Sequence, residues 1–99
     1  MSWSGVGSET WMAKLHFSLV APEQELYAGD VDQVNAPGSE GDFGVLPGHA
    51  PFMTALKEGE VTVIDGGTRR VFAIRGGFAD VTPEGLTILA EHASEAGAA

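Results

Sequence analysis

The chain contains no cysteine among its 99 residues. Disulfide bonds, thiol catalysis and zinc sites with cysteine ligands are therefore excluded. Basic residues are scarce as well, because 5 lysines and arginines stand against 14 aspartates and glutamates and leave a formal net charge of −9. Nucleic acids and anionic membrane surfaces bind through basic patches, so this charge speaks against both. It favours partners that are neutral or basic.

Long apolar runs are also missing. No segment approaches the roughly 20 apolar residues of a membrane-spanning helix, and no basic start followed by an apolar stretch resembles a signal peptide. We therefore expect a cytoplasmic protein without direct insertion into lipid. The hydrophobic fraction of 43% and the mean hydropathy of +0.05 are those of a globular chain, which argues against disorder.

No pattern typical of catalysis or metal binding is present. The three histidines, His16, His49 and His92, are far apart in the sequence and match no ligand motif such as HExxH. No serine sits in a GxSxG elbow. Close acidic pairs such as Glu58 and Glu60 fall where strand alternation turns both side chains to solvent. We therefore expect no catalytic residues, no metal and no cofactor.

The glycine-rich stretch 38–48 lacks the GK[ST] ending of a phosphate-binding loop, and Glu40 and Asp42 within it would repel phosphate. Its glycines are better explained by positive φ angles in a compact loop. The same loop carries three apolar side chains that we expect to be exposed, namely Phe43, Val45 and Leu46. An exposed loop of this kind on a rigid sheet is typical of a contact surface.

Apolar residues recur with a period of two along most of the chain, and glycine or proline signals interrupt them every 8–12 residues. This spacing favours an all-β sandwich or barrel, because a βαβ fold needs helical periods that do not occur before residue 90. We expect turns at 57–59, 66–67 and 82–85, and a break at Gly76-Gly77. Alternation predicts a core that includes Leu15, Phe17, Leu19, Val63, Phe78, Val81 and Leu89.

The chain divides into three parts by composition. Residues 1–12, rich in serine and glycine, have no period and precede a plausible start at Met12-Ala13, so we interpret them as a leader or a remnant of cloning. Residues 13–93 form the domain, and 94–99 form a short tail. Composition and pattern alone thus reach a small acidic β-sandwich that acts through contacts with other proteins.

Three segments resemble the epsilon subunit of F-type ATP synthases, which is called delta in mitochondria. Residues 37–56, PGSEGDFGVLPGHAPFMTAL, are similar to the family pattern GxEGxxGxxxxHAPxxxxL. Residues 17–34 resemble the first strands of the family, and residues 74–93 resemble its closing segment. The likeness covers about residues 13–93 in the correct order.

The resemblance implies a ten-stranded flattened β-barrel or sandwich, essentially antiparallel. It also implies a non-catalytic rotor subunit of the central stalk, on the cytoplasmic face of the inner membrane. Such a subunit links the gamma subunit to the ring of c subunits and couples proton translocation to ATP synthesis. The family's contact with the c-ring matches Ser39, Glu40, Gly41, Asp42 and Phe43. Its contact with gamma matches Ala21, Pro22, Glu23, His49, Ala50, Pro51 and Phe52.

Members of the family usually continue into a C-terminal helical hairpin, whereas the printed sequence ends at Ala99. We therefore expect neither nucleotide binding nor inhibition through such a hairpin. The residues leave one main alternative, a stand-alone small acidic β-barrel that serves as a binding or scaffold module. A ligand-binding barrel needs a lumen, which large inward side chains such as Phe17 and Ile88 would fill. An enzyme of unknown class lacks a nucleophile–base pair.

Overall fold

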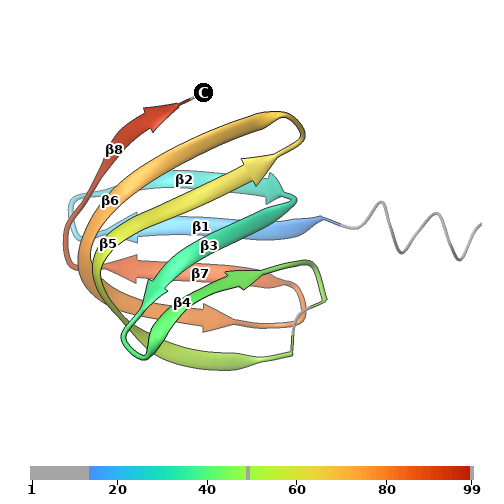
Figure 1. The fold of residues 1–99 in the computed structure, drawn as a ribbon, viewed down its shortest axis with the longest axis horizontal. Helices are drawn as coiled ribbons and strands as arrows, with labels where there is room; N and C mark the ends of the chain where they lie inside the picture. Colours follow the sequence, from blue (N-terminus) through green and yellow to red (C-terminus); the bar gives the residue numbers. More distant parts are fainter. Residues whose placement is uncertain (1–13, 49, 99) are drawn as a thin grey trace, which may run out of the picture.

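The computed structural model describes residues 14–48 and 50–98, and every regular element in these ranges is a β-strand (Figure 1). In chain order the strands are β1 (Leu15–Ala21), β2 (Gln24–Val31), β3 (Gln33–Gly38), β4 (Gly41–Val45), β5 (Phe52–Asp65), β6 (Thr68–Val81), β7 (Gly85–Ala90) and β8 (Ala93–Ala98). The expected all-β class is confirmed. The expectation of ten strands in a flattened barrel or sandwich is wrong in its strand number, because the described residues form eight strands, and these make an open sheet rather than a closed barrel.

The strands pair in the order β2-β1-β7-β6-β5-β3-β4, and β8 pairs with β6. Among the described strands only β1 and β7 run parallel, so the essentially antiparallel character is confirmed. Residues 77–81 of β6 pair with β7, whereas residues 70–74 pair with β8. The long β5–β6 hairpin curves around one side of the domain in Figure 1, and its β6 strand thus pairs with β7 near one end and with β8 near the other.

Aromatic side chains from β1, β2 and β6 pack together in the core. Tyr27 of β2 lies 5.6 Å from Phe17 of β1 and 6.1 Å from Phe72 of β6, measured between ring centroids. Phe17 and Phe72 are both fully buried. Edge and tilted ring contacts of this kind add to the stabilisation that comes from burial of the rings.

Two of the expected turns are confirmed. Gly66 and Gly67 connect β5 to β6, and Thr82 and Gly85 exchange backbone hydrogen bonds of 2.8 and 3.1 Å before β7. The turn expected at 57–59 is wrong, because β5 continues through it. Lys57 and Gly59 are compatible with a turn, but pairing with β6 on one side keeps this segment extended.

The break expected at Gly76-Gly77 is also wrong, because β6 runs through both glycines. Their φ angles of 112° and 141° are instead used within the strand. At this point β6 changes the phase of its buried residues, since Ile74 and Ala79 are both buried although they are five positions apart. A strand with strict alternation would turn one of them to solvent.

The core confirms most of the predicted positions. Five of the seven are at most 2% exposed, namely Leu15, Phe17, Leu19, Val63 and Val81. The prediction is wrong for Phe78 and Leu89, whose surfaces are 56% and 55% exposed. Val81 faces the core, so alternation turns Phe78, three positions earlier, to the opposite face. Leu89 follows the buried Ile88 and therefore also points outward.

Residues 94–98, which we expected to belong to a short tail, lie in β8 and pair with β6. Arg70 of β6 holds this strand by donating two hydrogen bonds to the carboxylate of Glu95, at 2.9 and 3.0 Å. The guanidinium also lies over the rings of Tyr27 and Phe72, 5.1 and 5.3 Å from their centroids. The ion pair raises the pKa of Arg70 and lowers the pKa of Glu95. Arg70 thus attaches β8 to the domain through a planar guanidinium that bonds Glu95 twice and stacks on two rings. A lysine side chain could not make this set of contacts.

A second ion-pair cluster joins Lys14, just before β1, to the β2–β3 connection and to the end of β5. Lys14 Nζ lies 2.7 Å from Asp32 Oδ1 and 2.6 Å from Asp65 Oδ1. Asp32 also accepts a hydrogen bond of 2.7 Å from the backbone N–H of Gly66. The hydrogen bond from Lys14, followed by that from Gly66, lowers the pKa of Asp32, while both carboxylates raise the pKa of Lys14.

Candidate functional site

The β3–β4 hairpin presents an acidic turn at the surface. Gly38 pairs with Gly41, so that Ser39 and Glu40 form the connection between the two strands. The backbone N–H of Ser39 donates a hydrogen bond of 2.9 Å to the carbonyl of Ala55, which ties the turn to β5. The glycine-rich segment is therefore a short hairpin rather than a long loop, and its φ of 138° at Gly41 meets the expectation of a positive angle there.

The residues matched to the c-ring contact lie together on this hairpin. Four of them are exposed, namely Ser39, Glu40, Gly41 and Asp42, and Phe43 is half-buried. Leu46 is 53% exposed, as expected, but Val45 is fully buried and the expectation that it is exposed is wrong. Val45 is the last residue of β4 and pairs with the buried Val34 of β3, so its side chain faces the core. The glycine-rich sequence around Val45 did not predict this pairing.

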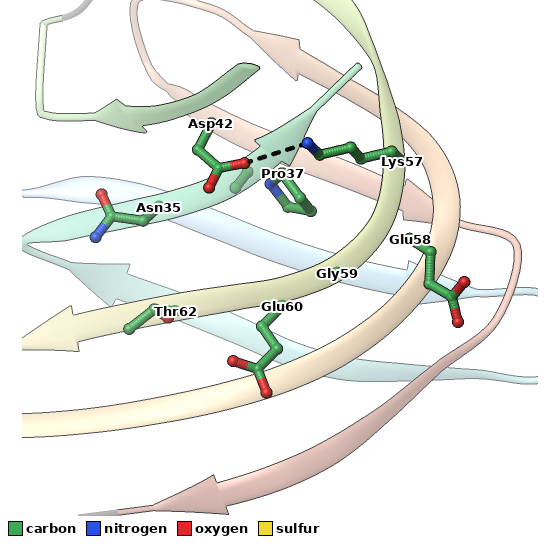
Figure 2. A pocket seen from close by; sticks show the side chains of 9 residues that line it. Asn35, Pro37, Asp42, Lys57, Glu58, Gly59, Glu60 and Thr62 are labelled. Carbon is green, nitrogen blue, oxygen red and sulfur yellow. Dashed lines mark ion pairs between the residues drawn. The ribbon is translucent and has the colours of Figure 1, made fainter. Parts of the chain in front are cut away.

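A polar groove of about 480 Å³ runs beside the hairpin. Figure 2 shows Asp42 of β4 and Lys57 of β5 reaching toward each other, with 4.0 Å between Oδ1 and Nζ. Both side chains are exposed, so this ion pair contributes little to stability. Glu58 and Glu60 also line the groove and make no ion pair within the described part of the chain. The groove is therefore net negative.

The residues matched to the gamma contact fall in two places. Ala21, Pro22 and Glu23 form the corner between β1 and β2, where Ala21 is buried and the other two are exposed. His49 lies outside the described residues. Ala50, Pro51 and Phe52 lead into β5; Ala50 and Pro51 are exposed and Phe52 is half-buried. Phe52 packs against Phe43, so the two expected contact surfaces meet at this point.

Between these two places lies a row of apolar side chains that sequence reasoning missed. Ala55, Phe78, Leu89 and Val20 are successive pairing partners across β5, β6, β7 and β1. We call these four residues the apolar row. Phe78 and Leu89 are more than half exposed, and Ala55 and Val20 are half-buried. Met53, 67% exposed, lies two residues before Ala55 and extends the row along the same face of β5.

The apolar row connects the two parts of the expected gamma contact. At the Val20 end it borders a groove of about 340 Å³ that Ala21 and Pro22 also line. At the Ala55 end it approaches the start of β5, where Phe52 lies. Three strand spacings separate the two ends, a distance of about 14 Å. The sequence did contain a sign of this row. In LTILAEH, Leu89 is an apolar residue at a position that strand alternation assigns to solvent.

The described residues contain no helix long and apolar enough to cross a membrane. Within the same ranges no group of three histidine, aspartate or glutamate side chains is arranged to hold a metal ion. No buried side-chain nitrogen or oxygen in the described part of the chain lacks a hydrogen-bond partner. Two exposed features stand out on the described surface: the turn of the β3–β4 hairpin, residues 39–42, which we call the acidic hairpin, and the apolar row.

Comparison with curated proteins gives close relatives. The ATP synthase epsilon chain of Caulobacter vibrioides is 76% identical over 85 residues, which cover 86% of this chain and 99% of that protein. The ATP synthase epsilon chain of Hyphomonas neptunium is 67% identical over 81 residues, which cover 81% of this chain and 60% of that protein. The matched segment thus spans nearly all of the first relative and about 60% of the second.

Solved structures show the same fold. A chain of the Euglena gracilis mitochondrial ATP synthase, in a structure of OSCP, F1 and the c-ring, matches with a TM-score of 0.79 and 27% identity. The match covers 84% of this chain and 54% of that chain. A chain from the central stalk and c-ring of the Tetrahymena thermophila enzyme has a TM-score of 0.68 at 16% identity, over 83% of this chain and 66% of that chain, and supports the fold alone.

The match to a whole family agrees with these relatives. The family model described as the ATP synthase delta/epsilon chain, beta-sandwich domain, covers residues 14–96, which include all strands from β1 to the middle of β8. The chain therefore belongs to the ATP synthase delta/epsilon family, through the beta-sandwich domain of that family.

Proposed function

We propose that the chain is a rotor subunit in the central stalk of an F-type ATP synthase. In this role it links the gamma subunit to the c-ring at the cytoplasmic face of the inner membrane, and it couples proton translocation to ATP synthesis without catalytic residues of its own. The observation that carries the proposal is that one sheet presents two exposed surfaces of different chemistry, the acidic hairpin and the apolar row.

The apolar row is the proposed binding surface for the gamma subunit. Exposed apolar side chains that are contiguous across several strands are uncommon on monomeric proteins and mark interaction surfaces. Phe78 and Leu89 stand directly opposite each other in the centre of the row, where the well-packed anchors of an interface are usually found. The row also joins the two segments that resemble gamma contacts in the family, around Pro22 and Phe52.

The acidic hairpin is the proposed binding surface for the c-ring. Glu40 and Asp42 project from a turn that is fixed by pairing of β3 with β4 and by the hydrogen bond from Ser39 to β5. Exposed carboxylates in fixed positions favour encounter with basic loops and set orientation more than affinity. A close-packed sandwich between the two surfaces resists deformation, which a part that transmits torque requires.

An add-back experiment tests this function. ATP synthase depleted of its epsilon subunit is reconstituted into vesicles, and ATP-driven proton pumping is measured before and after the chain is added. The proposal predicts that pumping per ATP hydrolysed rises when the chain is present. If the chain neither joins the enzyme nor changes the coupling ratio, the proposal is contradicted, and a stand-alone binding module becomes the better interpretation.

A further inference from the structure

The apolar row is bordered by carboxylates. Asp80 lies two positions beyond Phe78 on the same face of β6, directly opposite the exposed Met53 of β5. Glu91 lines the groove beside Leu89. We call these residues, together with Glu25, the acidic rim. Glu25 of β2 pairs with Val20 and so closes the row at its outer end.

The acidic rim is not neutralised by any basic side chain in residues 14–48 and 50–98. Asp80, Glu91 and Glu25 are exposed, and none of them forms an ion pair with the basic side chains of the described residues. Other carboxylates of the same chain are paired, as Asp32 is with Lys14 and Glu95 with Arg70. Among the described residues, the carboxylates without an ion-pair partner therefore include the three that border the apolar row.

We propose that the partner surface covering the apolar row has an apolar centre flanked by lysine or arginine side chains, which pair with Asp80, Glu91 and Glu25. This inference rests on the proposed function, in which the partner is the gamma subunit. It adds that the acidic rim determines the orientation and the rate of docking, while Phe78 and Leu89 supply most of the affinity.

Electrostatic reasoning supports this division. A partner that covers the row removes water from the adjoining carboxylates, which is unfavourable unless opposite charges replace the lost hydration. A surface without cations would therefore be penalised, and an anionic surface would be repelled. The excess of acidic over basic residues in the whole chain acts in the same direction and attracts a basic surface at long range.

Association kinetics test the inference. Association rates are measured with a complex of alpha, beta and gamma subunits that lacks epsilon, at about 20 mM and about 500 mM salt. Three proteins are compared: the wild-type chain, the rim variant Asp80→Lys/Glu91→Lys and the control Glu58→Lys/Glu60→Lys. The control changes the net charge by the same amount, at two carboxylates of the polar groove that do not belong to the acidic rim. We expect the rim variant to associate at least about tenfold more slowly than the control at low salt, and we expect the difference to shrink at high salt.

The outcomes separate the inference from the proposed function. If the rim variant and the control are slowed equally, only net charge matters and the acidic rim has no specific partner. In that case wild-type binding that is lost in Phe78→Ser/Leu89→Ser still supports the gamma contact. If the wild-type chain does not bind the complex, both the proposed function and the inference are overturned. Melting curves of each variant verify that these exposed substitutions leave the fold intact.

Discussion

The rings of Phe43 and Phe52 pack against each other at an interplanar angle of 70°, with 5.4 Å between their centroids. Phe43 belongs to the hairpin proposed for the c-ring, whereas Phe52 begins the strand that leads into the apolar row. This edge-to-face contact braces the hairpin against β5. The contact thus joins the acidic hairpin to the strand that carries Met53 and Ala55.

Charge reversal on the acidic hairpin should weaken binding to the c-ring. In Glu40→Lys/Asp42→Lys, we expect a roughly tenfold loss of affinity for the isolated ring at low salt and a smaller loss at high salt, since exposed charges are screened. ATP hydrolysis without pumping should rise in the reconstituted enzyme. The fold and binding to gamma should change little, and calorimetric melting serves as the control. Unchanged ring binding and unchanged pumping would identify the turn as merely solvated.

Two phenylalanines should differ sharply in their contribution to stability. Phe17 is fully buried, so Phe17→Ala should lower the free energy of unfolding by about 3–5 kcal/mol. A domain of this size has roughly 5–10 kcal/mol in total. Phe78→Ala, at a position 56% exposed, should cost less than about 1 kcal/mol. Urea unfolding measures both, and equal losses would contradict the outward orientation of Phe78.

Alanine at Gly77 should be destabilising through the backbone. The residue has a φ of 141°, and an added Cβ would collide with the backbone of Leu89 and Ala90 in the neighbouring strand. We expect Gly77→Ala to lower stability by about 2 kcal/mol or more. Gly67→Ala is the matched control, because nothing lies within 4 Å of its added Cβ. Similar melting temperatures for the two variants would show that β6 does not need this conformation.

Acid should weaken the domain through its ion pairs. The pKa values of Asp32 and Glu95 are lowered from their ordinary 3.8 and 4.5. A carboxyl group with a lowered pKa in the folded state stabilises the fold above its unfolded pKa, and this contribution is lost as the pH falls through the folded value. Urea midpoints should therefore fall below about pH 4.5.

The variant Asp32→Asn isolates one of these contributions, because it keeps an acceptor for the N–H of Gly66 but has no charge for Lys14. Its urea midpoint should decline less between pH 5 and pH 3 than that of the wild type. Glu84→Gln, at an exposed position without an ion pair in the described part of the chain, should follow the wild type. Parallel curves for all three proteins would contradict a role for the Lys14–Asp32 pair in acid sensitivity.

Local patterns predicted the strands and turns that depend on neighbouring residues alone. Alternation identified Leu15, Phe17 and Leu19 as core positions, and the Gly66-Gly67 turn follows from the same reasoning. These patterns failed where pairing between residues far apart in the sequence decides the structure. β5 and β6 continue past residues that favour turns because each strand holds the other extended, and the change of phase at Gly76-Gly77 reverses the alternation on which the core prediction relied.

The candidate surfaces were predictable to different degrees. The acidic hairpin depends on nearby residues, and its exposed members from Ser39 to Asp42 were found. The apolar row consists of residues from four strands, which only the register brings together. β8 was missed because its alanine, glutamate and serine residues have weak strand propensity, and tertiary contacts such as that of Arg70 with Glu95 outweigh this propensity.

Separate binding to the two partners tests the central claim most directly. The affinities of the wild-type chain, Phe78→Ser/Leu89→Ser and Glu40→Lys/Asp42→Lys are measured against the isolated c-ring and against the complex of alpha, beta and gamma subunits. The account predicts that the wild type binds both, that the first variant loses only the gamma-containing complex, and that the second is weakened only toward the ring. Wild-type affinity for both partners in both variants would contradict it.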